Sequence, residues 1–271
     1  MEHFEEAIKR TKLNYNNMVK KLEIELNTVG FLSSPYDVIR ENFNDWDNSF
    51  NYLNLNELIE SSGISKIISK VENSKQITRS EFIFYLEYVL FILTIPPRIH
   101  LSNLASFTFE NSSVYKIINS CLNTMNCKVF QNENGCFIVP KSGKVELATQ
   151  ITKKIYNLDE DLWIYNHNSI KNNLVKKADI LCRLYKYLEK KKSLIENYHY
   201  DAIYKDITKL MDALDIRHAP NKKEEEILNG MSKKEVLGWY DQVFQMSISI
   251  IILIDYTQKR KDIKELKGKL G

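Results

Sequence analysis

The residues of this 271-residue chain that are best suited to chemistry lie in one polar stretch, Asp215 to Lys223. Within it Arg217 and His218 are adjacent, and Asn221 follows shortly after. An arginine can stabilise negative charge that develops on a phosphate, and a histidine can take or give a proton near neutral pH. The pair therefore suits cleavage of a phosphodiester. RNA is the natural substrate, because its 2′-hydroxyl is an internal nucleophile.

The same stretch also allows a purely structural interpretation. It follows a helical pattern, and Arg217 and His218 stand where positive side chains bond the exposed carbonyls at a helix C-terminus. Lys222 and Lys223 add positive charge beside the pair and are candidate phosphate contacts. Residue chemistry alone favours the structural interpretation, so catalysis needs support from elsewhere in the chain.

The sequence lacks the motifs of the common nucleotide, zinc and serine-hydrolase enzymes. It contains no glycine-rich phosphate loop, no H-E-x-x-H helix, no G-x-S-x-G elbow and no C-x-x-C pair. The cysteines have the spacing of neither a disulfide framework nor a zinc site, and we expect reduced thiols, no metal and no cofactor. They are Cys121, Cys127, Cys136 and Cys182. We interpret the other histidines, His3, His100, His167 and His199, as surface or capping residues.

Charge and hydropathy predict a cytoplasmic protein. The first residues, MEHFEEAIKR, carry acids where a signal peptide needs bases. The apolar runs over 82–95 and 246–256 are shorter than the roughly 20 residues that span a bilayer, so we expect buried helices and no membrane partner. From residue 146 onward, 23 Lys and Arg stand against 19 Asp and Glu, a small excess of the sign that a phosphate partner requires.

The elements that must position these residues are mostly helices, because the chain has only 8 glycines and 5 prolines. Apolar periodicity predicts helices at about 2–28, 36–44, 55–62, 64–72 and 78–94, and a further helix that begins at Ser112 or Ser113. Thr78 with Glu81 and Ser232 with Glu235 have the spacing of capping boxes.

The period changes at residue 127, where two β-prone runs, 127–131 and 136–139, flank Asn132-Glu133-Asn134-Gly135. This pattern predicts a β-hairpin that must pack on helices, because a lone hairpin is only marginally stable. Beyond it we expect four helices, at about 145–157, 169–194, 201–215 and 233–258, in an antiparallel bundle. The expected buried stripes of the second and third are Leu174, Ala178, Leu181, Tyr185, Leu188 and Ile203, Ile207, Leu210, Leu214.

The predicted fold is therefore mainly α, in three parts. Residues 1–126 form an N-terminal helical region, residues 127–144 form the hairpin junction, and residues 145–271 form the C-terminal bundle.

The C-terminal half resembles the HEPN superfamily. The likeness rests on helix order, on the loop Asp215 to Asn221 and on the long final helix from Trp239 to Tyr256. Family members are helical bundles with a polar Arg-His motif near the start of the last long helix, and several resemble bacterial abortive-infection and toxin proteins that are metal-independent, dimeric ribonucleases. The resemblance implies that Arg217 clamps phosphate, His218 is the base and Asn221 is a hydrogen-bonding helper. The family separates its arginine and histidine by several residues, whereas here they are adjacent.

Three functional hypotheses follow. The first is a bacterial defence or toxin-type protein that binds RNA, and as an endoribonuclease cleaves it, in a homodimer. The alternative is a non-catalytic module of a phage-defence or regulatory system that dimerises or docks a protein partner, which an exposed apolar patch on the last helix would favour. A helical DNA-binding regulator is the weakest hypothesis, because no helix carries clustered base-reading side chains.

Overall fold

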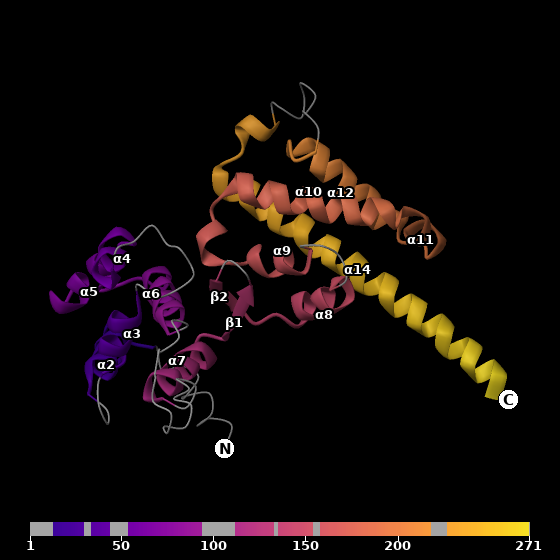
Figure 1. Ribbon diagram of the computed structural model, residues 1–271. Coiled ribbons are helices and arrows are strands. Elements are labelled where there is room, and N and C mark those ends of the chain that lie inside the picture. Colours follow the sequence, from indigo (N-terminus) through magenta and orange to yellow (C-terminus); the bar gives the residue numbers. More distant parts are fainter. Residues whose placement is uncertain are drawn as a thin grey trace, which may run out of the picture. The chain divides into compact units, whose positions relative to one another are not determined.

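The structure, a computed structural model, describes residues 13–29, 34–43, 54–93, 112–132, 135–153, 158–217 and 227–270. Most of these residues are helical, and they include one two-stranded antiparallel sheet (Figure 1). The expectation of a mainly α protein with a small β-hairpin is confirmed. Contacts divide the chain into two compact units, Met1–Lys141 and Ser142–Gly271.

The helices of the N-terminal unit follow the apolar periodicity of the sequence. They are α2 (Tyr15–Asn27), α3 (Pro35–Asn42), α4 (Leu55–Ser61), α5 (Ile64–Glu72), α6 (Arg79–Ile92) and α7 (Ser113–Thr124). Ser112 caps α7, since its side chain accepts a hydrogen bond from the backbone of Tyr115. The first part of the long helix predicted over 2–28 lies outside the described residues.

The capping box at Thr78 fixes the start of α6. The Thr78 Oγ1 accepts from the Glu81 backbone N–H at 3.2 Å, and the Glu81 carboxylate accepts from the Thr78 backbone N–H at 2.8 Å. Two of the orphan donors at the helix N-terminus are thereby satisfied. The box predicted from the sequence is confirmed.

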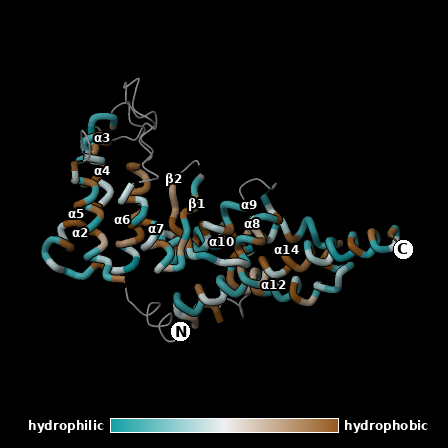
Figure 2. Tube along the Cα trace, turned by 90° about the horizontal axis from the view of Figure 1, so that it is seen from below, coloured by the Kyte–Doolittle hydropathy of each residue, from teal (hydrophilic) through white to brown (hydrophobic). Residues whose placement is uncertain are grey.

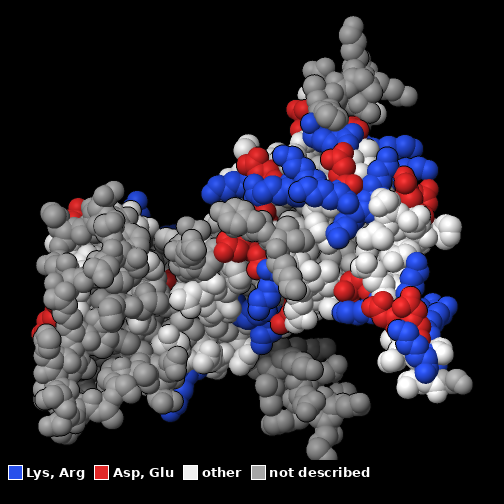
Figure 3. All heavy atoms as spheres, turned by 45° about the vertical axis from the view of Figure 1, so that its right-hand side comes forward, with Lys and Arg blue, Asp and Glu red and all other residues white. Residues whose placement is uncertain are grey.

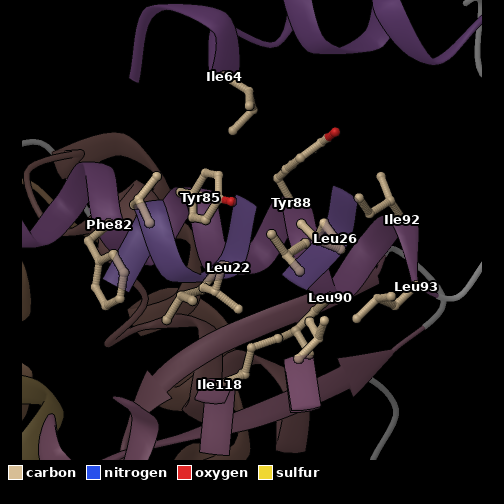
Figure 4. Packing of buried hydrophobic residues seen from close by; sticks show 14 of the residues in the cluster. Leu22, Leu26, Ile64, Phe82, Tyr85, Tyr88, Leu90, Ile92, Leu93 and Ile118 are labelled. Carbon is tan, nitrogen blue, oxygen red and sulfur yellow. The ribbon is translucent and has the colours of Figure 1, made fainter. Parts of the chain in front are cut away.

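Helix α6 lies at the centre of the N-terminal core, because it is apolar on most of its circumference. Its fully buried side chains include Phe82, Tyr85 and Leu86, which belong to one hydrophobic cluster with Leu22 and Leu26 of α2. Figure 4 shows Phe82 and Tyr85 beside these leucines. The run over 82–95 that falls short of a membrane span is, over its described residues, a buried helix as expected.

The β-hairpin belongs to the N-terminal unit. Strand β1 (Cys127–Asn132) pairs with β2 (Gly135–Pro140), with Val129 opposite Ile138. The Ile138 N–H donates to the Glu87 carboxylate of α6 at 2.6 Å, and Ile138 itself is buried. The hairpin therefore packs on a helix, as a marginal two-stranded sheet requires.

The C-terminal unit has more helices than the four expected. Its described elements are α8 (Gly143–Thr152), α9 (Leu158–Ile164), the 3-10 turn η3 (Asn168–Ile170), α10 (Leu174–Lys190), α11 (Lys192–Asn197), α12 (Asp201–Ala213) and α14 (Lys233–Leu270). Helix α14 packs against α8, α10 and α12. The predicted helix over 169–194 is wrong at both ends, because η3 precedes α10 and a turn at Lys191 separates α10 from α11.

The buried faces differ from the expected stripes in detail. On α10, Leu181, Tyr185 and Leu188 are buried as expected, while Leu174 and Ala178 are only half-buried. In the α12 segment Ile207 and Leu214 are buried as expected, but Tyr204 and Met211 are buried in place of Ile203 and Leu210, which are half-buried. Pattern reading favours aliphatic residues, but a tyrosine with a bonded hydroxyl fills the same space.

Helix α14 is buried only in its first two thirds. Its buried side chains run from Val236 to Ile254, and all residues from Gln258 to Leu270 are exposed. By length and composition it meets the criterion for a membrane span, with 44% of its most apolar 18-residue window buried. The core helix of a soluble protein meets the same criterion. The helix extends twelve residues beyond the predicted end at residue 258.

Candidate functional site

The chain turns sharply after α12 and brings Arg217 back beside that helix. Asp215 adopts the left-handed conformation, with φ of 54°. The N–H groups of Ile216 and Arg217 both donate to the Met211 carbonyl, at 3.0 and 3.3 Å. The helix C-terminus is thus closed by backbone donors rather than by the Arg217 side chain.

The guanidinium of Arg217 is held by two side chains. Its Nε and Nη2 donate to the two carboxylate oxygens of Asp212 at 2.8 and 2.9 Å. Its Nη1 donates to the Tyr185 hydroxyl at 2.5 Å, and the guanidinium carbon lies 4.7 Å from the centroid of the Tyr185 ring. The Asp212 carboxylate raises the pKa of Arg217, so the cation is fixed in charge as well as in place.

A tyrosine network continues from this ion pair into the unit. The Tyr204 hydroxyl donates to the Tyr185 hydroxyl at 3.1 Å, and their rings stack with centroids 5.8 Å apart. Thr208 Oγ1 lies 3.3 Å from the Tyr185 hydroxyl. Arg217 therefore ties the segment after α12 to α10 through a connected set of hydrogen bonds.

The remaining residues of the sequence-derived site are not in view. His218, Asn221, Lys222 and Lys223 lie outside the described residues. Of that site, the structure places Arg217 alone. Two N–H groups of its guanidinium already donate to Asp212. A phosphate would bind the guanidinium in the same bidentate geometry.

A second group of basic side chains lies on the exposed face of α10. Arg183 donates from Nε and Nη2 to both oxygens of the Asp161 carboxylate in α9, at 2.5 and 2.7 Å. Around this pair the surface forms a hollow of about 450 Å³. Its lining residues are Leu158, Asp161, Arg183, Lys186, Tyr187, Lys190 and Lys191. Figure 3 shows Lys and Arg side chains gathered on the C-terminal unit.

The sequence alone does not predict this hollow. The run Lys190-Lys191-Lys192 stands out as a charge cluster, but Arg183 and Lys186 do not. The available signal was the helical spacing of 183, 186, 187 and 190, which places these side chains on one stripe of α10. The sequence does not predict the contact of Asp161 with Arg183, because α9 has only seven residues and is too short to be recognised from apolar periodicity.

A third ionic site contains the buried Lys177. Its Nζ donates to Asp241 Oδ1 at 2.6 Å and lies 4.4 Å from the centroid of the Tyr165 ring. The Tyr165 hydroxyl donates to the same oxygen at 3.1 Å. The side chain of Lys177 is 5% exposed and that of Asp241 is 57% exposed. This site joins α10 to α14 and stabilises the unit.

The thiols and histidines in view show no sign of catalytic activation. All four cysteines are free, as expected, and burial raises the pKa of Cys121 to about 11. His167 is buried and caps η3, since its ring accepts from the Ser169 backbone, so its capping role is confirmed and a surface position is wrong. Among the described residues no group of three or more His, Cys, Asp and Glu is placed to hold a metal ion.

Comparison with protein-family models, with curated proteins and with solved structures finds no match to this chain. The resemblance to the HEPN superfamily therefore stays a prediction.

Proposed function

We propose that the C-terminal unit binds RNA at the hollow beside α10. One observation carries the proposal: Arg183, Lys186, Lys190 and Lys191 line the same surface as Tyr187, and Asp161 is the only acid among the described lining residues. Basic side chains follow the phosphates of a single strand, and an aromatic ring stacks on a base without requiring a particular sequence.

The ion pair of Asp161 and Arg183 shapes this hollow rather than neutralising it. Both carboxylate oxygens are committed to Arg183, so the lysines that follow along α10 keep their positive charge for a ligand. Lys186 and Lys190 are exposed and stand one helical turn apart. They are the two phosphate contacts in the proposal.

The proposal includes metal-independent cleavage, with His218 as the proton acceptor in a homodimer and α8, α10, α12 and α14 as a HEPN-like four-helix core. The packing of α14 against the other three helices supports that core. The contacts of Arg217 with Asp212 and Tyr185 favour a positioning role for it over a phosphate clamp. In this arrangement Arg217 holds the chain where His218 begins.

Binding is tested with the purified chain and a fluorescently labelled single-stranded RNA at several salt concentrations. In the double variant Lys186→Ala/Lys190→Ala we expect the RNA affinity to fall about tenfold. The negative slope of log K against log salt should become shallower by about 1.4, because two phosphate contacts are lost. Exchange of two exposed lysines of the N-terminal unit, Lys20→Ala/Lys116→Ala, removes the same charge and should leave both quantities unchanged. Equal losses in the two variants would show that binding is only a matter of net charge.

Cleavage is tested with the same RNA in the presence of EDTA. The wild-type chain should produce fragments and His218→Ala should not, while RNA affinity stays the same. Equal cleavage by both proteins, or none by either, would remove the catalytic part and leave the binding part standing.

A non-catalytic dimerisation module is the second candidate. The observation in its favour is the exposed apolar set on the last helix, which comprises Trp239, Tyr256, Ile263, Leu266 and Leu270. Exposed apolar side chains that recur on one helix indicate a protein interface.

A further inference from the structure

The last turns of α14 carry an apolar stripe that no described residue of their own unit covers. In the views of Figures 1 and 2 this end of the helix runs clear of the other helices of its unit, and hydrophobic positions recur to its C-terminal end. Ile263, Leu266 and Leu270 are 54%, 57% and 79% exposed, and Tyr256 is 61% exposed. The contacts of this end with its own unit are polar: Thr257 Oγ1 lies 2.9 Å from the Tyr200 hydroxyl, and Lys261 Nζ lies 4.5 Å from the centroid of the Tyr198 ring. The apolar side chains of the stripe take no part in them.

The spacing of the stripe is that of a coiled coil. With Tyr256 at position a of a heptad, Ile263 and Leu270 also fall at a and Leu266 falls at d. Isoleucine at a with leucine at d is the combination that favours two parallel strands. Lys259 occupies the remaining d position.

The stripe points away from the helix bundle. With about 100° of rotation per residue, it lies about 130° around α14 from the mean direction of the buried side chains. A partner helix can therefore approach it while the face from Val236 to Ile254 stays packed on α8, α10 and α12.

The charges beside the stripe select a second copy in parallel orientation. Asp255 and Asp262 stand at g positions, and Arg260 and Lys267 stand five residues later at e positions. In a parallel pair each g residue meets the e residue of the next heptad on the partner, so both contacts join opposite charges. An antiparallel pair would instead bring Arg260 against Lys267.

We propose that residues 256–270 of α14 form a parallel two-stranded coiled coil with the same segment of a second copy of this chain. The proposal gives the dimer expected for the proposed function a specific surface, and it rests on that function only for its biological use. The ion pair of Asp255 with Lys259 within one helix, at 2.8 Å, would exchange for the contact with Arg260 of the partner. The segment from Lys259 to Lys269 has six basic and two acidic residues, so added salt should strengthen the dimer by screening the net repulsion.

The first experiment measures mass by analytical ultracentrifugation over a range of protein concentrations. The wild-type chain should approach twice 31.9 kDa. The variant Ile263→Ser/Leu266→Ser should stay monomeric at concentrations on the order of tenfold higher, with unchanged helix content and thermal stability, because both residues are exposed. The control Ile24→Ser/Val175→Ser removes two other exposed apolar side chains and should dimerise like the wild type.

The second experiment tests orientation and register by exchanging charges. Asp262→Lys alone and Lys267→Asp alone each place like charges across the seam, and each should be monomeric. Their mixture should form a heterodimer, because each g-to-e contact then joins opposite charges again.

Four results would overturn the proposal. The first three are a wild-type chain that is monomeric at every concentration, a dimer that survives Ile263→Ser/Leu266→Ser, and a mixture of the charge variants that stays monomeric. A fourth is binding of the wild-type chain to phosphatidylglycerol vesicles that Ile263→Ser/Leu266→Ser abolishes without a change in mass, since the stripe would then serve a membrane surface. RNA binding is measured separately, so it can fail without the dimer failing.

Discussion

The two units bury ionisable side chains in different ways. In the N-terminal unit the Glu23 carboxylate accepts hydrogen bonds from the hydroxyls of Tyr85 at 2.5 Å and Tyr36 at 3.2 Å. In the C-terminal unit the cations of Lys177 and Arg217 are each paired with a carboxylate. One unit thus compensates a charge with neutral donors, and the other with opposite charges.

The difference decides how each unit responds to a lost partner. A neutral donor does not repay the full cost of burying a charge, and desolvation accordingly raises the pKa of Glu23 in spite of its two tyrosines. An opposite charge offsets more of this desolvation cost, but removing one member of the ion pair leaves the other as an unpaired buried charge. The C-terminal unit should therefore be the more sensitive to single substitutions at its ionic sites.

The largest effect is expected for Asp241→Ala. It leaves the buried ammonium of Lys177 without its carboxylate and should lower the free energy of unfolding by about 2–3 kcal/mol, somewhat less than for a fully enclosed pair. The measurement is urea unfolding followed by the fluorescence of Trp163, which is buried in this unit. Adding Lys177→Met should restore much of the loss, and a double variant as unstable as the single one would contradict the argument.

A smaller effect is expected for Arg217→Ala, because Arg217 and Asp212 are each about a quarter to a third exposed. We expect a loss of about 1–2 kcal/mol in the same unfolding experiment. The stability of Arg217→Lys should lie between those of the wild type and Arg217→Ala, because lysine keeps the charge but not the bidentate contact. If Arg217→Lys instead leaves stability unchanged and weakens RNA binding, Arg217 is a phosphate clamp and not a positioning residue.

The smallest effect, of opposite sign, is expected for Glu23→Gln in the N-terminal unit. Because the pKa of Glu23 is raised in the folded state, the wild-type unit loses stability as pH rises from the ordinary value of 4.5 through the raised one. Glutamine keeps an acceptor for both tyrosines without a charge. The variant should therefore match the wild type at low pH and unfold at a higher temperature at pH 8, and equal melting temperatures at both pH values would count against a buried charge.

Much of the fold could be predicted because its signals are local. The capping boxes at Thr78 and Ser232 depend on residues three positions apart, and both form as the sequence predicts. The hairpin follows from a polar turn between two β-prone runs. Such features need no knowledge of what packs against them.

The features that were missed depend on tertiary contacts. Helix α9 has only seven residues, too few for a periodic stripe, although Leu158, Leu162 and Trp163 are all buried. No glycine or proline marks the turn at Lys191. The apolar pattern ends α14 too early, because apolar burial stops at Ile254 while strong helix formers continue the helix to Leu270.

The candidate site was predictable only as a set of residue types. The sequence places Arg217 beside His218, but it does not show that the Arg217 guanidinium donates hydrogen bonds to Asp212 and Tyr185. Tyr185 lies on another helix, so the contact depends on tertiary packing. Arg183, Lys186 and Lys190 have helical spacing but do not stand out in the sequence, and nothing in the sequence marks Asp161 as the partner of Arg183.

The boundary between the units has a practical consequence for dividing the gene. The Lys141 N–H donates to the Asn126 carbonyl within the N-terminal unit, while the next residue, Ser142, caps α8 through the Val145 N–H. Two adjacent residues thus belong to different units, and no linker separates them. A cut that separates the halves must fall between these two residues, and a C-terminal fragment starting even one residue later would lack the cap of its first helix.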